Sequence, residues 1–473
     1  MRAAVGGHGA MLAALTLALA LRALAVLGYP PALWFWADSF TYVRAALDPE
    51  PAAYRTVGYS FLLKLLEPLH DAGAVAVLQH LMGLVLAVVV YALLRRSLPG
   101  WAATLLVTPL LLDEFQILLE HMIMAETLFT ALVTGAVAVL LRAPRPGVAD
   151  AVAAGAMLGA AVTVRTVALP LVLLALAWLL VRRAGWRPVL AGALAAAVPL
   201  VAYLTWFRVE RGVFALSQAE GIFLYARTTT FADCDRMRPP PAEARLCPGT
   251  PPGSRPKPAR WIWDASSPLN HLPKGSDRNG LAGDFARRAI LAQPGDFLRA
   301  GLADLAPVFR WPRRDPVPIP GNPYEFPSAS RPLRGASAEA ARAYHDGPPE
   351  TRVAEPYAGW LRAYQRWGYL PGPALAALLL AGLGGIVISR RRAEILLPWA
   401  TAVALLALPP FIVGFDLRYA MPAVPAACLA AGLALDRSAW TRRTRRSAGS
   451  GGSGGVSSGG WSRRRGSARP GAA

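Results

Sequence analysis

The sequence predicts an all-α integral membrane protein with about ten transmembrane helices, an interfacial helix on the outer face and a long extracytoplasmic loop. Of its 473 residues, 54% are hydrophobic and only 16% are charged. The mean hydropathy of +0.36 is higher than a soluble chain of this length would show. Apolar runs long enough to cross a bilayer recur along the chain, with short basic clusters between them.

These runs set the expected order of elements. We expect spans at about 9–28, 72–94, 101–119, 121–141, 149–164, 166–181, 188–207, 371–389, 395–413 and 419–435. The predicted divisions are an N-terminal membrane bundle (1–207), an extracytoplasmic segment (208–370), C-terminal membrane helices (371–435) and a disordered basic cytoplasmic tail (436–473).

Arginines indicate which ends of the spans share a side of the membrane. Basic clusters follow the second, fourth, sixth, eighth and tenth spans, at 95–96, 142–145, 182–183, 390–392 and 442–446. Positive residues concentrate on the cytoplasmic side, so ten spans with both termini cytoplasmic place every cluster there. We therefore expect a multi-pass protein of the plasma (cell inner) membrane. The net charge of +20 is then a topology signal, and no nucleic-acid partner is expected.

The segment 208–370 falls outside under this topology, and it contains Cys234 and Cys247. Cysteines in an oxidising compartment form disulfides, so we expect these two to pair. Proline-rich sequence around them predicts an extended, stapled loop rather than a packed core. From residue 279 onward, apolar residues at helical spacing predict two helices divided at Pro294. Cys428, in an apolar run, is expected to be a packing residue.

Asp38 follows three aromatic residues, in "WFWADSFTYV", where the first outer segment begins. Phe40, Val43 and Leu47 share one helical face, which predicts a short helix in the outer interface. Aspartate is a favoured N-cap, with a stabilisation of about 1 kcal/mol, so Asp38 either caps this helix or takes part in chemistry.

Further acids occur near the turn between the third and fourth spans. We interpret Asp113 and Glu114 as solvated turn residues. Glu126 lies inside an apolar run, where an ionisable group costs about 2.5–3.5 kcal/mol. It should face the bundle interior, either as a functional group or as the partner of a membrane arginine.

Three arginines, Arg55, Arg165 and Arg418, are expected near the same outer face. A guanidinium group presents a rigid fork of donors that suits phosphate and diphosphate groups. The alternative is that these side chains reach the interface only to place their charge in water.

With these acids and cations in place, the chain resembles the polytopic GT-C glycosyltransferases that use lipid-phosphate-linked sugars, in particular dolichyl-phosphate-mannose–protein mannosyltransferases and aminoarabinose transferases. The resemblance is carried by "WADSFTY", "RTVGYSFLLKLL", "HMIMAETLF", "VTVRTVALPLVLL" and "RYAMPAVPAACLAAG", in that order. The segment "LYARTTTFADCD" is similar to actinobacterial-type members. The matches cover most of the membrane part.

The resemblance implies specific roles. Asp38 matches the first-loop acid that serves as catalytic base and takes a proton from an acceptor hydroxyl, with inversion at the sugar. Glu126 matches an acid that positions the sugar or the acceptor. The residues implied to bind the polyprenyl-phosphate-linked sugar are Arg55, Tyr59, Arg165, Arg418 and Tyr419. Glu120 and His121 are held as a reserve pair, because the first loop lacks a second acid.

Other classes of function remain to be weighed. We find no Walker-type GxxxxGK[ST], HExxH or CxxC motif, which argues against an ATP-driven pump or a zinc protease, and nothing supports a cofactor or a metal. The alternative to a glycosyltransferase is a transporter or lipid-handling protein that binds an anionic substrate with the same charges. An envelope scaffold would leave Glu126 and Arg165 without a purpose.

Overall fold

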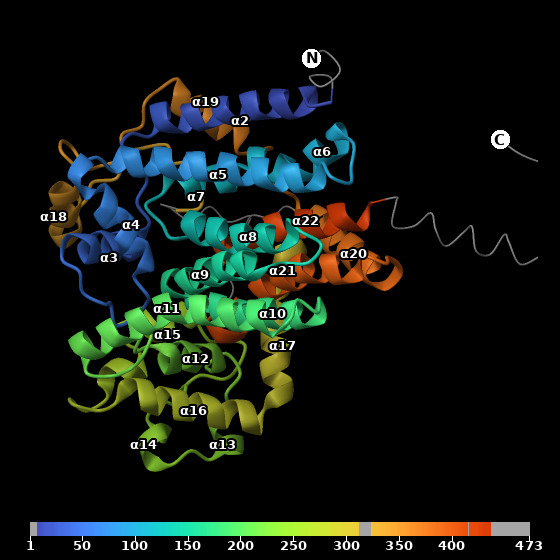
Figure 1. Ribbon diagram of the computed structural model, residues 1–473. Coiled ribbons are helices and arrows are strands. Elements are labelled where there is room, and N and C mark those ends of the chain that lie inside the picture. The colour runs from blue at the N-terminus through green and yellow to red at the C-terminus, as the bar shows by residue number, and fades with distance from the viewer. Residues whose placement is uncertain (1–6, 312–322, 415, 437–473) are drawn as a thin grey trace, which may run out of the picture.

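The structure is a computed structural model that describes residues 7–311, 323–414 and 416–436. Within these residues it is all-helical, with one isolated bridge between Leu33 and Met122. The tail predicted at 436–473 lies, apart from Asp436, outside the described residues. Figure 1 shows the helices stacked as a bundle, with a smaller group of helices on one flank.

The bundle is formed by α2 (Gly9–Gly28), α5 (Ala72–Leu94), α6 (Gly100–Leu112), α7 (Glu114–His121), α8 (Glu126–Leu141), α9 (Val148–Val164), α10 (Leu169–Val181), α11 (Trp186–Arg211), α20 (Gly372–Ile388), α21 (Arg392–Ile412) and α22 (Val424–Ala434). Outside it lie α3 (Trp36–Leu47), α4 (Gly58–Leu66), α12 (Glu220–Thr228), α13 (Cys234–Met237), α14 (Pro241–Ala244), α15 (Pro258–Trp263), α16 (Arg278–Ala292), α17 (Pro294–Leu305), α18 (Gly335–Tyr344) and α19 (Tyr357–Tyr364). Short 3-10 turns are η1 (Glu67–Leu69), η2 (Thr166–Ala168), η3 (Pro268–His271), η4 (Ala306–Phe309) and η5 (Leu417–Ala423).

Long apolar helices make this a multi-pass membrane protein. In the described part of the chain, 5 helices are long and apolar enough to cross a membrane, or up to 6 if the bent pair α6–α7 is one span. Four shorter apolar helices of 10–17 residues accompany them. Apart from the third, each predicted span overlaps one of the described apolar helices, while the count of ten stays a prediction.

The predicted third span, 101–119, is broken. Helices α6 and α7 meet at an angle of 46°, because the carboxylate of Asp113 caps α7 by accepting hydrogen bonds from the backbone N–H groups of Phe115 and Gln116. Asp113 and Glu114 are each only 2% exposed. The interpretation of these two as solvated turn residues is therefore wrong.

Basic loops gather at one end of the bundle. Arg96 donates to the carbonyl of Arg142 (2.7 Å), and Arg391 donates to Ser97 (3.0 Å). Arg182 lies 3.5 Å from Glu394. The first four clusters that were expected to share a side are thus near one another, and the fifth, at 442–446, lies outside the described residues. The opposite end of the bundle holds α3 and α4 (Figure 1).

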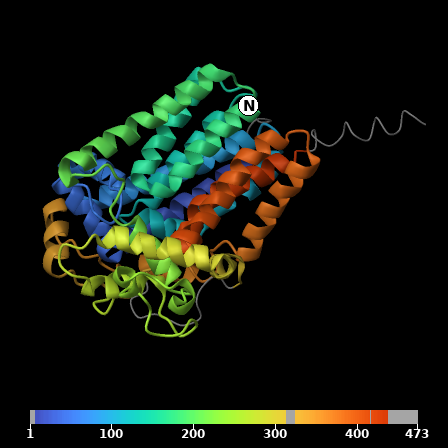
Figure 2. The same ribbon diagram turned by 90° about the horizontal axis from the view of Figure 1, so that it is seen from below.

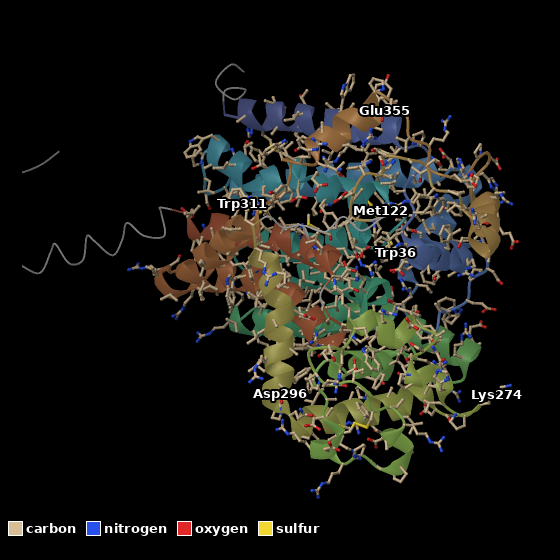
Figure 3. The ribbon with its side chains drawn as sticks, turned by 180° about the vertical axis from the view of Figure 1, so that it is seen from behind. Trp36, Met122, Lys274, Asp296, Trp311 and Glu355 are labelled. Carbon is tan, nitrogen blue, oxygen red and sulfur yellow. A yellow bond between two sulfur atoms is a disulfide. The ribbon has the colours of Figure 1, made fainter. Side chains whose placement is uncertain are left out.

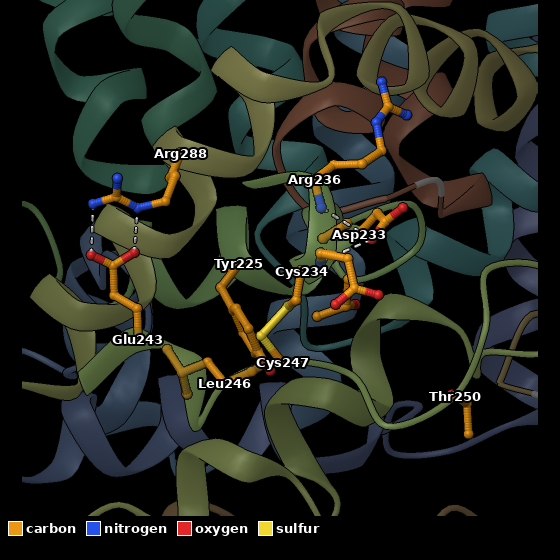
Figure 4. The surroundings of a disulfide bond; sticks show 12 residues. Tyr225, Asp233, Cys234, Arg236, Glu243, Leu246, Cys247, Thr250 and Arg288 are labelled. Carbon is orange, nitrogen blue, oxygen red and sulfur yellow. Dashed lines mark hydrogen bonds and ion pairs between the residues drawn. A yellow bond between two sulfur atoms is a disulfide. The ribbon is translucent and has the colours of Figure 1, made fainter. Parts of the chain in front are cut away.

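The flanking helices α12–α16 have a core of their own, in which Tyr225, Leu246 and Phe285 are fully buried. Cys234 and Cys247 form a disulfide at its edge (Figure 4), and Arg288 binds Glu243 beside it (3.0 Å). The expectation of an extended loop here is wrong, because the proline-rich stretch forms short helices that pack on α16 and α12.

Helix α17 joins this unit to the bundle. It begins at Pro294, as expected, and its Phe297 ring packs 5.5 Å from Phe411 of α21. Figure 1 shows α17 rising from the end of α16 toward the bundle, and the yellow helix that lies across the view from below is α16 (Figure 2). The flanking unit is thereby fixed to the C-terminal membrane helices.

Candidate functional site

Asp38 lies between two arginines. Arg55 Nη2 is 2.7 Å from Asp38 Oδ1, and Arg418 Nη1 donates to Asp38 Oδ2 at 2.9 Å. The N-cap position of α3 is held by Phe35, whose backbone N–H donates to the Ser39 hydroxyl (2.8 Å). Asp38 stands in the first turn, so it is not the cap of this helix and its carboxylate is used for ion pairing.

Glu126 is the first residue of α8 and is 2% exposed. Its Oε1 accepts a hydrogen bond from Arg165 and lies 3.7 Å from Arg418 Nε. Its Oε2 is buried and has no hydrogen-bond partner among the described residues. A buried carboxylate oxygen without a donor is costly, so this oxygen marks a point where a ligand hydroxyl or amine would be stabilised.

Arg418, in η5, lies at the centre of the group. Besides Asp38 it contacts Asp416 (3.1 Å), and its guanidinium stacks over the rings of Phe35 (4.5 Å) and Tyr419 (5.2 Å). Arg165 lies over the other side of the same site, 4.9 Å from the Tyr419 ring. Planar guanidinium groups held on aromatic faces lose little freedom when they bind a ligand.

We call the three arginines and three carboxylates of this site the charge cluster: Arg55, Arg165, Arg418, Asp38, Glu126 and Asp416. Its members come from chain segments far apart, and their formal charges cancel. Figure 3 labels Trp36 and Met122, which mark the start of α3 and the segment leading to Glu126. That segment is fixed because Leu33 N–H donates to the His121 carbonyl (3.0 Å) and Ile123 N–H to the Leu33 carbonyl (3.1 Å).

Electrostatics keep Asp38 ionised. Burial raises the pKa of its carboxyl, but the guanidinium groups of Arg418 and Arg55 outweigh this, so the pKa lies well below its ordinary value of 3.8. Burial lowers the pKa of Arg55, while neighbouring Tyr42 and Asp38 raise it above the usual value. Both groups therefore stay charged at neutral pH.

The cluster lies at the end of the bundle away from the basic loops. Glu126 begins α8 and Arg165 follows the last residue of α9, whereas the loop that joins these two helices carries Arg142 at the other end. Asp38, Arg55 and Arg418, which contact one another and the Glu126–Arg165 pair, therefore lie at this same end.

Tyr59 and the reserve pair lie outside the cluster. Tyr59 is fully buried, donates to Gln79 (2.8 Å) and packs against the ring of Tyr42, so it forms a layer behind the site. Glu120 pairs with Arg22 (2.8 Å) in a separate buried network between α2, α5 and α7. In that network His80 contacts both Glu120 (3.0 Å) and His121 (3.1 Å).

Sequence reasoning missed two members of the site. Asp416 precedes Arg418 by two residues, and its Oδ2 accepts a hydrogen bond from Tyr324 (2.8 Å). An acid two residues before a buried arginine in "FDLRY" was the available signal for Asp416. No local signal marked Tyr324. In the described ranges, no group of three or more His, Cys, Asp or Glu side chains could hold a metal ion.

Among known proteins, the chain is similar to solved structures but not to any family model or curated sequence. No protein-family model matches the chain, and no curated protein sequence matches it. Among solved structures it is similar to ArnT from Cupriavidus metallidurans bound to undecaprenyl phosphate, with 14% identity, a TM-score of 0.36 and coverage of 91% of this chain and 78% of that one. It is also similar to the Archaeoglobus fulgidus oligosaccharyltransferase in the apo form. The identity is 14%, the TM-score is 0.42, and the match covers 93% of this chain and 52% of that one.

A third similar structure is the archaeal oligosaccharyltransferase AglB from Archaeoglobus fulgidus in complex with an inhibitory peptide and a dolichol-phosphate. The identity is 13%, the TM-score is 0.39, and the match covers 94% of this chain and 52% of that one. The chain therefore spans about half of the length of that oligosaccharyltransferase. These neighbours belong to the GT-C superfamily, the group that the sequence resembles. The backbones overlap only in part, so the charge cluster, rather than this similarity, carries the proposal that follows.

Proposed function

We propose that the chain is a membrane glycosyltransferase that moves a sugar from a polyprenyl-phosphate donor to an acceptor at the extracytoplasmic face, with inversion. The observation that carries the proposal is the charge cluster: three arginines held on aromatic rings meet three carboxylates at the end of the bundle away from the basic loops. This topology, in a plasma membrane with both termini cytoplasmic, gives the cluster access to a lipid-linked substrate from the outer side.

Each side chain has a role in the proposed reaction. Arg55, Arg165 and Arg418 bind the donor phosphate and stabilise its charge as the bond to the sugar breaks. Asp38 takes the proton of the acceptor hydroxyl while that oxygen forms its bond to the anomeric carbon. The polyprenyl phosphate leaves with the electron pair of the broken bond, so no strong acid is needed. The unpartnered oxygen of Glu126 accepts a hydrogen bond from the sugar or the acceptor.

The test compares envelope glycolipids and glycans by mass spectrometry in strains that lack the gene or carry it as wild type, Asp38→Asn or Asp48→Asn at matched expression. Asp48 is the matched control, because it is an exposed acid at the other end of α3. We expect a sugar addition that returns with wild type and Asp48→Asn but not with Asp38→Asn. Full restoration by Asp38→Asn would refute the role of Asp38.

One observation favours the second candidate function, a transporter or lipid-handling protein for an anionic substrate. Both oxygens of Asp38 are engaged by arginines, which suits a binding site at which no proton is transferred. In that case the glycan profile would be the same in all four strains, and transport of a lipid-linked anion would change instead.

A further inference from the structure

The paired state of Asp38 works against its proposed role as a base. Arg55 occupies Oδ1 at 2.7 Å and Arg418 occupies Oδ2 at 2.9 Å. A carboxylate oxygen must face the acceptor hydroxyl within hydrogen-bond distance in order to take its proton. The side chain is only 14% exposed, so little of it is open to an incoming acceptor. Release from at least one arginine would restore both the basicity of Asp38 and its access to the acceptor.

The same two arginines are needed by the donor phosphate. Arg418 is 9% exposed and the Arg55 side chain is 23% exposed, so little of either guanidinium group is open to a phosphate while Asp38 is bound to it. Arg418 has a second carboxylate in Asp416 at 3.1 Å, which lets it exchange Asp38 for another anion without a buried uncompensated charge. The carboxylate and the phosphate therefore compete for one pair of cations.

We propose that the donor phosphate displaces Asp38 from Arg55 and Arg418, so that Asp38 becomes a free base only when the donor is bound. This inference rests on the proposed function and adds the order in which the substrates act: the lipid-linked donor binds first and the acceptor reacts second. The exchange involves no covalent step, since one anion replaces another on the guanidinium groups. Asp38 then takes the acceptor proton while the polyprenyl phosphate leaves.

Competition makes an unusual prediction for binding. Removing the charge of Asp38 removes the competitor, so a variant that fails as a transferase should hold the phosphate more tightly than wild type. The measurement is the affinity for undecaprenyl phosphate incorporated in nanodiscs, with undecaprenol as the uncharged reference. We expect Asp38→Asn to bind about tenfold more tightly, which corresponds to 1.4 kcal/mol.

A control separates direct competition from a general change in charge. Asp48→Asn removes the same charge at the exposed end of α3, where no arginine pairing with the charge cluster is lost. Its affinity should equal that of wild type, and the gain of Asp38→Asn should persist at high salt, since screening weakens long-range attraction more than contact pairs. Equal gains for both variants, or none for Asp38→Asn, would overturn the proposal.

A second variant covers the case in which Asp38→Asn does not fold. Glu126→Gln removes a carboxylate that binds Arg165 and also lies 3.7 Å from Arg418 Nε, one of the two exchanging arginines. It too should tighten binding of undecaprenyl phosphate, and unchanged or weaker binding would count against the exchange. A parallel titration with inorganic phosphate identifies the source of the anion. An increase in affinity for either ligand supports the exchange. A larger increase for undecaprenyl phosphate than for inorganic phosphate shows that the lipid chain contributes.

The binding experiment distinguishes failure of the donor-first exchange from failure of the proposed transferase function. If wild type binds undecaprenyl phosphate and Asp38→Asn binds it no more tightly, the donor-first order is wrong and the transferase proposal stands. If neither the wild-type protein nor any variant binds undecaprenyl phosphate or inorganic phosphate, the phosphate-donor function itself is wrong, and the exchange falls with it.

Discussion

Gly83, in the middle of α5, is required by the buried carboxylate of Glu120. A Cβ atom at this position would lie 1.8 Å from Glu120 Oε1 and 2.6 Å from its carboxyl carbon. The carboxylate cannot withdraw, because Arg22 holds both of its oxygens at 2.8 and 3.0 Å and Gln116 donates to it at 3.0 Å. An alanine at residue 83 must therefore break the ion pair or push α5 away from α7.

The size of the effect follows from these contacts. An alanine in place of a helical glycine normally stabilises by about 0.5–1 kcal/mol. Breaking a buried ion pair costs about 3–5 kcal/mol. We therefore expect Gly83→Ala to lower the free energy of unfolding by about 2–4 kcal/mol.

Unfolding of the detergent-solubilised protein, followed by tryptophan fluorescence, measures this loss. Gly384→Ala is the matched control: it is also in a membrane helix, α20, and a Cβ there would meet nothing within 4 Å, so its stability should equal or slightly exceed that of wild type. In a Glu120→Ala background, Gly83→Ala should cost almost nothing, because the clashing group is gone. An equal cost in both backgrounds would refute the assignment of the strain to Glu120.

Two further predictions concern the flanking unit and the charge cluster. Replacing Cys234 and Cys247 with serine should cost about 3 kcal/mol, seen as faster proteolysis of the unit formed by α12–α16 with the bundle left intact; unchanged proteolysis would mean that the disulfide adds no stability. The folded-state pKa of Asp38 is depressed below the ordinary 3.8, so its stabilising effect is complete above that value and is lost as the pH falls through the folded-state pKa. The difference in melting temperature between wild type and Asp38→Asn should therefore be constant from about pH 7 to 5 and shrink below about pH 4, and a difference that grows on acidification would contradict the ion pairing.

The fold was predictable where hydropathy alone decides it. A helix such as α5 or α21 is long and apolar, so its position follows from the length needed to cross a bilayer. The break between α6 and α7 was not predictable, because it depends on whether the Asp113 side chain caps the next helix or faces water. Nor was the packing of the proline-rich stretch, since a buried residue such as Leu246 gains its partners from α12 and α16, which lie elsewhere in the sequence.

Apart from Asp416, the members of the charge cluster could be predicted, whereas their pairing could not. Charged residues near the ends of apolar runs are costly, and the topology put Asp38, Glu126 and Arg165 on one face. Which carboxylate meets which arginine depends on helix packing: Asp38 and Arg418 are 380 positions apart in the chain. The local sequence was therefore compatible with two interpretations of Asp38, as a helix cap or as a catalytic base. The structure gives it a third state, a carboxylate already bound by two cations, and the proposed exchange is the step that frees it to act as a base.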